Sequence, residues 1–415
     1  MRATGRGPST RFEPAAVTTR ARSLGQSPTF VGARIDEEER VTMIRGFRRE
    51  MVLAVGAAVI VGACSSGGGG ASSGTGAGLP NVPQTLIDAA KAEGNLSTIA
   101  LPHDWCNYGQ IIDGFKAKFG IKVNELKPDA GSGDEIEAIK ANKDNPGPQA
   151  PDVVDVGITF GDPAKTDKLI QAYKVATWDT IDPKLKDPDG YWYGDYYSIL
   201  TFETNTSATK SPADWADLLG PDYKNKVALA GDPRASSQAY NAVYAAALAN
   251  GGSLDNAQPG LDFFKKLNDA GNFVPTIAKP GTIDTGVTPV TIRWAYNALS
   301  HKDTAKGNPP IEVVVPKAGR FLGVYAQAIS AYAPHPNAAK LWMEYLYSDE
   351  GQAGWLKGYC HTTRLDDLKA RKVSSDLIAK LPDITGAVYP TSAQAAKAKD
   401  LITKQWDTVV GANVK

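Results

Sequence analysis

The sequence predicts an α/β fold, because strand-like and helix-like segments alternate along its first ordered part. Between residues 86 and 157, three short apolar strand segments are separated by segments whose apolar residues keep helical spacing. Gly94 and Gly120 stand where two of the helices should end. This alternation favours a parallel sheet with helices on its faces. Ligands of such sheets bind at the loops that follow the carboxyl ends of the strands.

The first elements follow from local patterns. We expect a helix over residues 86–93, strands over 96–101 and 121–126, and a helix that carries Ile111 and Phe119. Ser132 and Glu135 form a capping-box pattern that opens a helix through residue 140. Residues 152–157, Asp-Val-Val-Asp-Val-Gly, are typical of a buried strand.

The second half of the chain continues the pattern less regularly. An aromatic run at residues 191–197 is followed by a predicted helix start at Ser211-Pro212. We expect strands at 227–230, 290–294 and 311–315. Helices are expected at 237–250, at 261–270, from residue 336 onward and near 393–409.

Composition excludes two classes of protein. The 415 residues carry 45 basic and 45 acidic side chains. From Cys64 onward the count is 35 basic and 39 acidic, so no strong basic field exists and nucleic-acid binding is not expected. No apolar run reaches the roughly 18–20 residues of a spanning helix, which excludes a multi-pass membrane protein.

The N-terminal part is interpreted as a targeting segment. Residues 1–42 are Arg-rich and Lys-free, and we expect them to be disordered or to precede the true start at Met43. Residues 43–63 combine three arginines with an apolar stretch, as in a lipoprotein signal peptide. The tetrad that ends in Cys64 resembles the bacterial lipobox, in which the cysteine receives a diacylglycerol; the alternative is a short signal anchor. Residues 64–82 are a flexible Gly/Ser tether.

Several weak motifs occur in a recognisable order behind this segment. They are Pro151-Asp152-Val153-Val154-Asp155, Trp192-Tyr193-Gly194, Ser211-Pro212-Ala213-Asp214, Val315-Pro316-Lys317-Ala318-Gly319 and His335-Pro336-Asn337-Ala338-Ala339. Together they resemble an extracellular solute-binding protein of a bacterial ABC importer, of the type II periplasmic-binding-protein class that includes iron(III) and polyamine binders. The resemblance covers residues 83–367.

The resemblance implies two α/β lobes, each with a central sheet flanked by helices, joined by a two-strand hinge. Lobe I would comprise residues 83–199 and 322–415, the latter including the C-terminal helices, and lobe II residues 200–321. It implies a non-enzymatic monomer without a cofactor, which binds a small-molecule solute between closing lobes. An ABC permease and its ATPase would be the partners, at the outer face of the cytoplasmic membrane.

Candidate ligand contacts lie on loops after strands and at helix starts. Asp104 and Trp105 suit a sugar face or an ammonium group. Ser132 in lobe I and Ser236 and Ser237 in lobe II suit an anion, with Arg234 beside them, although ordinary capping is the alternative. The remaining candidates are Asp155, Tyr193 and Asp195, then Trp294 in the segment Arg293-Trp294-Ala295-Tyr296, and Tyr325. Trp294 is the strongest single choice, because the resemblance places a cleft aromatic there.

The solute class stays open. The acid that follows an aromatic in polyamine binders has no counterpart in residues 319–325, and Tyr196-Tyr197 comes too early to match the tyrosine pair of iron(III) binders. A small polar solute, with or without an anionic group, is the expectation.

Two cysteines remain beyond Cys64. Cys106 and Cys360 suggest a disulfide in an exported protein, although His103 and His361 beside them leave a metal as the alternative. We expect no metal. The familiar catalytic motifs are absent from the sequence. The alternatives to transport are a sensory ligand-binding lobe and a surface-anchored hydrolase with a carboxylate pair.

Overall fold

The computed structural model describes Leu79 and residues 81–415. The predicted signal peptide at 43–63, the predicted lipid-accepting Cys64 and residues 1–42 lie outside the described residues. Within the described part, none of the helices is both long enough and apolar enough to span a lipid bilayer.

Lobe I begins with the alternating elements that the sequence predicts. They are α1 (Gln84–Glu93), β1 (Asn95–Ile99), α2 (Tyr108–Phe119), β2 (Lys122–Leu126), α3 (Ser132–Asn142) and β3 (Val153–Gly157). Gly94 and Gly120 adopt left-handed conformations with φ of 70° and 71°, which end α1 and α2 as expected. β1 pairs with β2 in parallel, and the Asp152 N–H donates to the Ser97 carbonyl, which places β3 beside β1.

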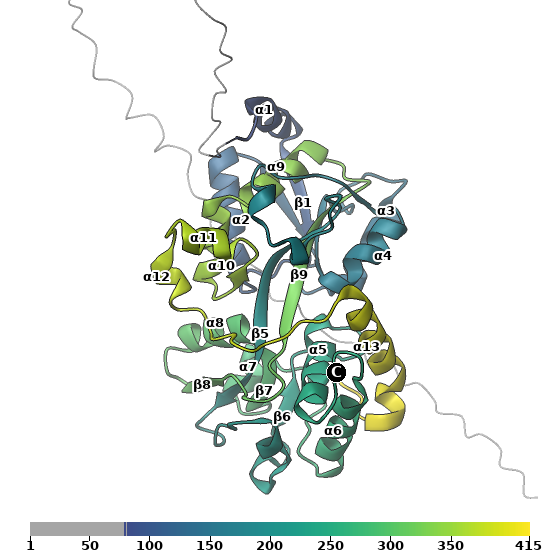
Figure 1. Cartoon of the computed structure of the whole chain (residues 1–415), viewed down its shortest axis with the longest axis vertical. Helices are drawn as coiled ribbons and strands as arrows, with labels where there is room; N and C mark the ends of the chain where they lie inside the picture. Colours follow the sequence, from purple (N-terminus) through teal and green to yellow (C-terminus); the bar gives the residue numbers. More distant parts are fainter. Residues whose placement is uncertain (1–78, 80) are drawn as a thin grey trace, which may run out of the picture. The chain divides into compact units, whose positions relative to one another are not determined.

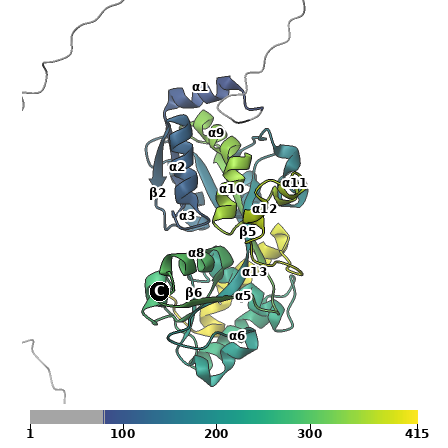
Figure 2. The same cartoon turned by 90° about the vertical axis from the view of Figure 1, so that its left-hand side faces the viewer.

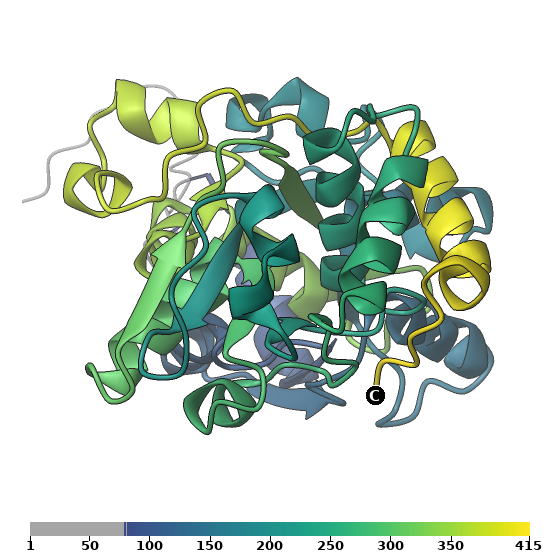
Figure 3. The same cartoon turned by 90° about the horizontal axis from the view of Figure 1, so that it is seen from below.

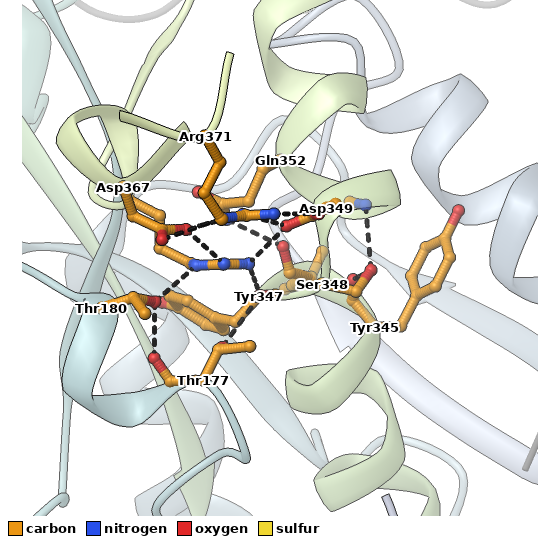
Figure 4. A network of polar contacts seen from close by, with 12 residues as sticks. Thr177, Thr180, Tyr345, Tyr347, Ser348, Asp349, Gln352, Asp367 and Arg371 are labelled. Atoms are coloured by element: carbon orange, nitrogen blue, oxygen red, sulfur yellow. Dashed lines mark hydrogen bonds and ion pairs between the residues drawn. The ribbon is translucent and has the colours of Figure 1, made fainter. Parts of the chain in front are cut away.

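Lobe I is completed by segments from both halves of the chain. After β3 come a 3₁₀ turn (Ile158–Phe160), α4 (Gly161–Thr166) and β4 (Ile170–Gln171). The later elements are α9 (Pro336–Leu346), α10 (Asp349–Lys357), β10 (His361–Thr362), α11 (Leu365–Ala370) and α12 (Ser375–Ile378). Arg371 bridges Asp349 of α10 and Asp367 of α11 at 2.7 Å each, so a charged network fixes these helices together (Figure 4).

Two long strands connect the lobes. β5 (Tyr193–Asn205) and β9 (Leu322–Ser330) belong to one eight-stranded sheet with the order β3-β9-β5-β7-β6. β5 pairs with β9 up to Ile199↔Leu322 and with β7 from Leu200↔Trp294 onward. The change of partner occurs at the point where β5 passes from one lobe to the other (Figures 1 and 2).

Lobe II surrounds the far half of β5. Its strands are β6 (Val227–Leu229), β7 (Val290–Trp294) and β8 (Ile311–Val314), and its helices are α5 (Ser237–Ala249), α6 (Gln258–Asp269), α7 (Pro280–Asp284) and α8 (Ala295–Ala305). The segment after Ser211-Pro212 differs from the predicted helix: Asp214 caps a 3₁₀ helix over Trp215–Leu219. A Cβ on Gly260 would lie 2.0 Å from the Val243 carbonyl, so glycine allows α5 and α6 to pack closely.

The C-terminal helix corrects the predicted domain boundaries. α13 (Ser392–Gln405) and the π-helical turn Trp406–Val410 lie beside α5 and α6 of lobe II (Figures 1 and 3). Trp406 packs against Phe264, and the Ile277 N–H donates to the Lys415 carbonyl. The C-terminal segment packs there because Trp406 lies on its apolar face and completes the core of lobe II. α13 also reaches lobe I, where Lys399 lies 3.6 Å above the Phe160 ring.

Candidate functional site

A cavity of about 500 Å³ lies between the two lobes. Its lobe I wall consists of the loops after β1 and β2 and the end of β3. Its lobe II wall consists of the loop after β6, the end of β7 and the starts of α5 and α8. Polar groups therefore converge from the carboxyl ends of strands in both lobes, which is where α/β sheets bind their ligands.

Seven of the predicted ligand-binding residues line this cavity. They are Asp104, Trp105, Ser132, Asp155, Ser236, Ser237 and Tyr325. These residues are far apart in the sequence and lie together at the cavity, most of them in a loop after a strand or at the start of a helix. Their contact with a solute stays a prediction.

Four predicted residues do not line the cavity, and two of these lie in the core of lobe I. Tyr193 is fully buried, with its ring 4.8 Å from that of Tyr347 and 5.2 Å from that of Trp178. Asp195 is also fully buried and accepts from Gln327 Nε2 at 3.2 Å. The expectation of direct contact needs correction for both, because the aromatic run packs inward.

Arg234 and Trp294 require the same correction. The Arg234 guanidinium donates to Asp232 and Asp407 at 2.8 Å and to Asn413 at 3.1 Å, so it fastens the C-terminal segment to lobe II. Trp294 is fully buried, and its indole fills the space above Gly323 of β9. A Cβ on Gly323 would lie 2.1 Å from Trp294 Cη2, so Trp294 belongs to the hinge core.

Two helix starts from opposite lobes meet at Gly157. The Gly157 N–H donates to Ser132 Oγ at 3.1 Å, and a Cβ on Gly157 would lie 2.6 Å from Ser237 Oγ. α3 and α5 each have 11 or more residues, and their N-terminal ends carry partial positive charge. Hydroxyls and backbone N–H groups of both lobes therefore face the same part of the cavity.

An aromatic cage with residues from both lobes lies around Asp155. We define the cage as Trp105, Tyr196, Tyr296 and Tyr325. The Tyr196 hydroxyl donates to Asp155 Oδ2 at 2.8 Å, and Trp105 Nε1 donates to the Tyr196 hydroxyl at 2.6 Å. The Trp105 ring lies 5.2 Å from that of Tyr296 and 5.7 Å from that of Tyr325. A carboxylate among aromatic faces is suited to a cation.

The carboxyl groups around the cage are difficult to ionise. Burial raises the pKa of Asp155 to about 7, against the hydrogen bonds that favour its charged form. Burial and the neighbouring Asp155 raise the pKa of Asp195. Burial likewise raises the pKa of Glu135, whose Oε2 accepts from the Asp155 N–H at 2.8 Å. Burial is the first cause of the raised pKa for each of the three carboxyl groups.

Arg293 is the charged group on the lobe II side. Its Nη1 donates to Glu203 Oε2 at 3.0 Å, and Glu203 also contacts His301 Nδ1. Burial opposes protonation of His301, but the contact with Glu203 and the charge of Asp284 leave the pKa of His301 raised. Glu203 therefore contacts both Arg293 and His301, and Arg293 lines the cavity from the lobe II side.

Sequence reasoning missed several lining residues. Arg293 lies in a segment that the sequence singles out, but the sequence favours its neighbour Trp294. Glu135, Gln238, Lys279 and Asn297 also line the cavity. Asn297 lies in the first turn of α8 after a strand end, the same signal that identified Ser132 and Ser237.

The two cysteines of the folded part form a disulfide. Cys106 and Cys360 are bonded, with their Cα atoms 5.9 Å apart. The bond fastens the loop that carries Trp105 to the segment after α10. Within residues 79 and 81–415, no three His, Cys, Asp or Glu side chains are grouped so as to hold a metal ion.

Comparison with known proteins places this architecture in a family. Residues 149–376 match the family model described as bacterial extracellular solute-binding protein. An uncharacterized protein of Haemophilus influenzae is 27% identical over 267 residues, which cover 59% of this chain and 70% of the relative.

Solved structures share the fold at low identity. The periplasmic binding protein AfuA from Actinobacillus pleuropneumoniae, with fructose-6-phosphate bound, is 23% identical with a TM-score of 0.59, covering 76% of this chain and 99% of that one. Iron-bound HitA from Pseudomonas aeruginosa is 17% identical with a TM-score of 0.56, covering 75% and 98%. The type II periplasmic-binding-protein fold that the sequence predicts is confirmed.

Proposed function

Because this chain belongs to the family of bacterial extracellular solute-binding proteins, which serve ABC importers and are not enzymes, we propose that it captures its solute in the cavity between the lobes. Closure of the lobes around the solute creates the form that the permease and its ATPase accept. The observation that carries this proposal is the convergence of strand ends and helix starts from both lobes on one cavity.

The mechanism follows from differential affinity. A solute that contacts Asp155 in lobe I and Arg293 in lobe II gains both contacts only when the lobes are close together. It therefore shifts the equilibrium toward the closed form by the free energy of the second contact. The hinge strand β5 pairs with β9 in lobe I and with β7 in lobe II, so closure bends a shared sheet without separating it.

The relatives with known ligands do not decide which solute is bound. AfuA holds fructose-6-phosphate and HitA holds iron, so one fold serves different chemistries. A thermal-shift screen with purified chain tests the proposal. A solute at about 100 times its Kd stabilises the folded form by about 2.7 kcal/mol. A screen of sugars, sugar phosphates, amino acids, polyamines, phosphonates, thiamine and iron(III) chelates without any shift would contradict it.

The sequence supports attachment of the chain to the outer face of the cytoplasmic membrane through Cys64. The signal-like segment 43–63, the small residues before Cys64 and the tether after it all fit a lipoprotein. Cys64→Ser should abolish incorporation of labelled palmitate and release the protein from membranes. Ser65→Ala is the matched control and should stay attached. Membrane attachment of Cys64→Ser would refute the lipid anchor.

A further inference from the structure

We propose that the solute is a zwitterion, whose ammonium group is bound by Asp155 inside the aromatic cage and whose oxyanion is bound by Arg293 and the serine-bearing helix starts. This inference rests on the proposed function and names the substrate class of the same cavity. It covers amino carboxylates, amino phosphonates and amino phosphate esters, which share these two charges.

The first step is the unmet need of Asp155 for a cation. Asp155 is only 5% exposed, and its Oδ1 has no hydrogen-bond partner among the described residues. Oδ2 accepts from the Tyr196 hydroxyl at 2.8 Å. A buried carboxylate without a counter-ion is costly, whereas an ammonium supplies both the opposite charge and the missing donors. Asp104, on the same wall of the cavity, adds a second carboxylate.

The second step is the aromatic cage itself. Tyr196 and Tyr325 stack with ring centroids 5.3 Å apart, and Trp105 meets both Tyr296 and Tyr325 edge to face. Aromatic faces attract cations, and the attraction strengthens when water is excluded. Trp105 and Tyr325 line the cavity, so the cage is open to a ligand on that side.

The third step is the positive end in lobe II. Arg293 is only 5% exposed, lines the cavity and has an Nε without a partner among the described residues. Its guanidinium presents further N–H donors in a planar fork that suits an oxyanion. Ser132 and Ser237 meet at Gly157 at the starts of α3 and α5, where backbone N–H groups favour negative charge. Lys279 adds a second cation to the lining.

The fourth step is the charge of the other lining groups. Asp134 accepts from the Gly131 N–H, and Asp232 is occupied by Arg234. The acids that remain are therefore on the lobe I wall, and the bases Arg293 and Lys279 are on the lobe II wall. A solute with one charge of each sign matches both walls and bridges the lobes.

Other solutes match one wall only. A polyamine would satisfy Asp155 but present a second ammonium to Arg293. A sugar phosphate would satisfy Arg293 but leave Asp155 without a counter-ion. For iron, the described residues hold no group of three His, Cys, Asp or Glu side chains that could bind a metal ion.

Titration calorimetry on the full chain in detergent tests the inference with matched probes. The zwitterions are 2-aminoethylphosphonate, 4-aminobutanoate and phosphoethanolamine. Each zwitterion has a counterpart without the amine, namely ethylphosphonate, butanoate and ethyl phosphate in turn, and ethylamine serves all three as the counterpart without the anion. Putrescine and glucose complete the set. At least one zwitterion should bind about 100-fold tighter than both of its single-charge counterparts, because each lost partner leaves a buried charge unpaired.

Two variants test which residue binds the ammonium group of the solute and which binds its oxyanion. Asp155→Asn should weaken the zwitterion about 100-fold while leaving the weak affinity for ethylphosphonate unchanged, and Arg293→Gln should do so for the zwitterion while sparing ethylamine. Circular dichroism and thermal midpoints check that both variants fold, and Asp104→Asn serves as a milder second variant on the same wall. Tighter binding of putrescine, glucose or a single-charge probe would overturn the zwitterion and leave the solute-binding function standing. If none of the zwitterionic, cationic, anionic or neutral probes bound, both the zwitterion inference and the proposed solute-binding function would be overturned.

Discussion

Replacement of Trp294 by alanine should destabilise the protein through the hinge core. The indole is fully buried, and it occupies the space that Gly323 leaves open in β9. β5 pairs with β7 at Leu200↔Trp294, so the side chain lies where β5 passes between the lobes. Removal of the indole leaves a cavity that rigid strands on both sides cannot fill.

The size of the effect follows from that burial. Truncation of a buried tryptophan to alanine costs about 3–5 kcal/mol, through lost apolar contact and the cavity that remains. At about 2–4 °C per kcal/mol for chains of this order of size, the thermal midpoint should fall by roughly 6–20 °C. Urea unfolding followed by tryptophan fluorescence and circular dichroism measures the change directly.

Trp105 provides the matched control. Trp105→Ala removes a tryptophan that lines the cavity and is only partly buried. It should lower solute affinity with a smaller loss of stability than Trp294→Ala. If Trp294→Ala kept the parental midpoint and lost solute binding, the assignment of Trp294 to the hinge core would be refuted.

Three further predictions concern charge, the disulfide and the contact between lobes. Burial raises the pKa of Asp155 to about 7, and only the ionised carboxylate pairs with an ammonium group. Affinity for an ammonium-bearing solute should therefore rise as the pH increases through about 7. Unchanged affinity in calorimetry at several pH values would contradict this prediction. Cys106→Ser combined with Cys360→Ser should lower the free energy of unfolding by about 2–5 kcal/mol, and two free thiols in non-reducing mass spectrometry of the parent would exclude the bond. Gly157→Ala adds a Cβ 2.6 Å from Ser237 Oγ and should weaken solute binding about tenfold by holding the lobes apart, with little change in thermal midpoint; equal affinity in calorimetry would show that this contact is not needed for closure.

Local sequence signals predicted the elements of lobe I well. Gly94 and Gly120 end helices because left-handed backbone costs glycine little, and this signal needs no tertiary information. The rule that ligands bind after strand ends then identified Asp104 and Ser132, which both line the cavity. Both signals are local, or depend only on the order of the elements.

Contacts between distant segments were beyond local reasoning. Arg234 looked available for an anion beside Ser236, but its guanidinium is held by Asp407, which lies 173 residues further along the chain. The sequence also places the C-terminal segment in lobe I, because no local pattern near residue 406 indicates that Trp406 packs into the core of lobe II. Such pairings depend on which surfaces meet after folding.

The choice between Arg293 and Trp294 shows how one residue decides a site. Adjacent residues of a strand point to opposite faces, so a shift of one position exchanges the cavity side for the packed side. The aromatic residue was preferred because cleft aromatics are common in the resembling family, yet β9 contains the deciding feature. Gly323 stands between Leu322 and Val324, and glycine within a strand marks close approach of another group. That group is the Trp294 indole, and Arg293 is the residue of the pair that lines the cavity, where Asp155 lines the lobe I wall.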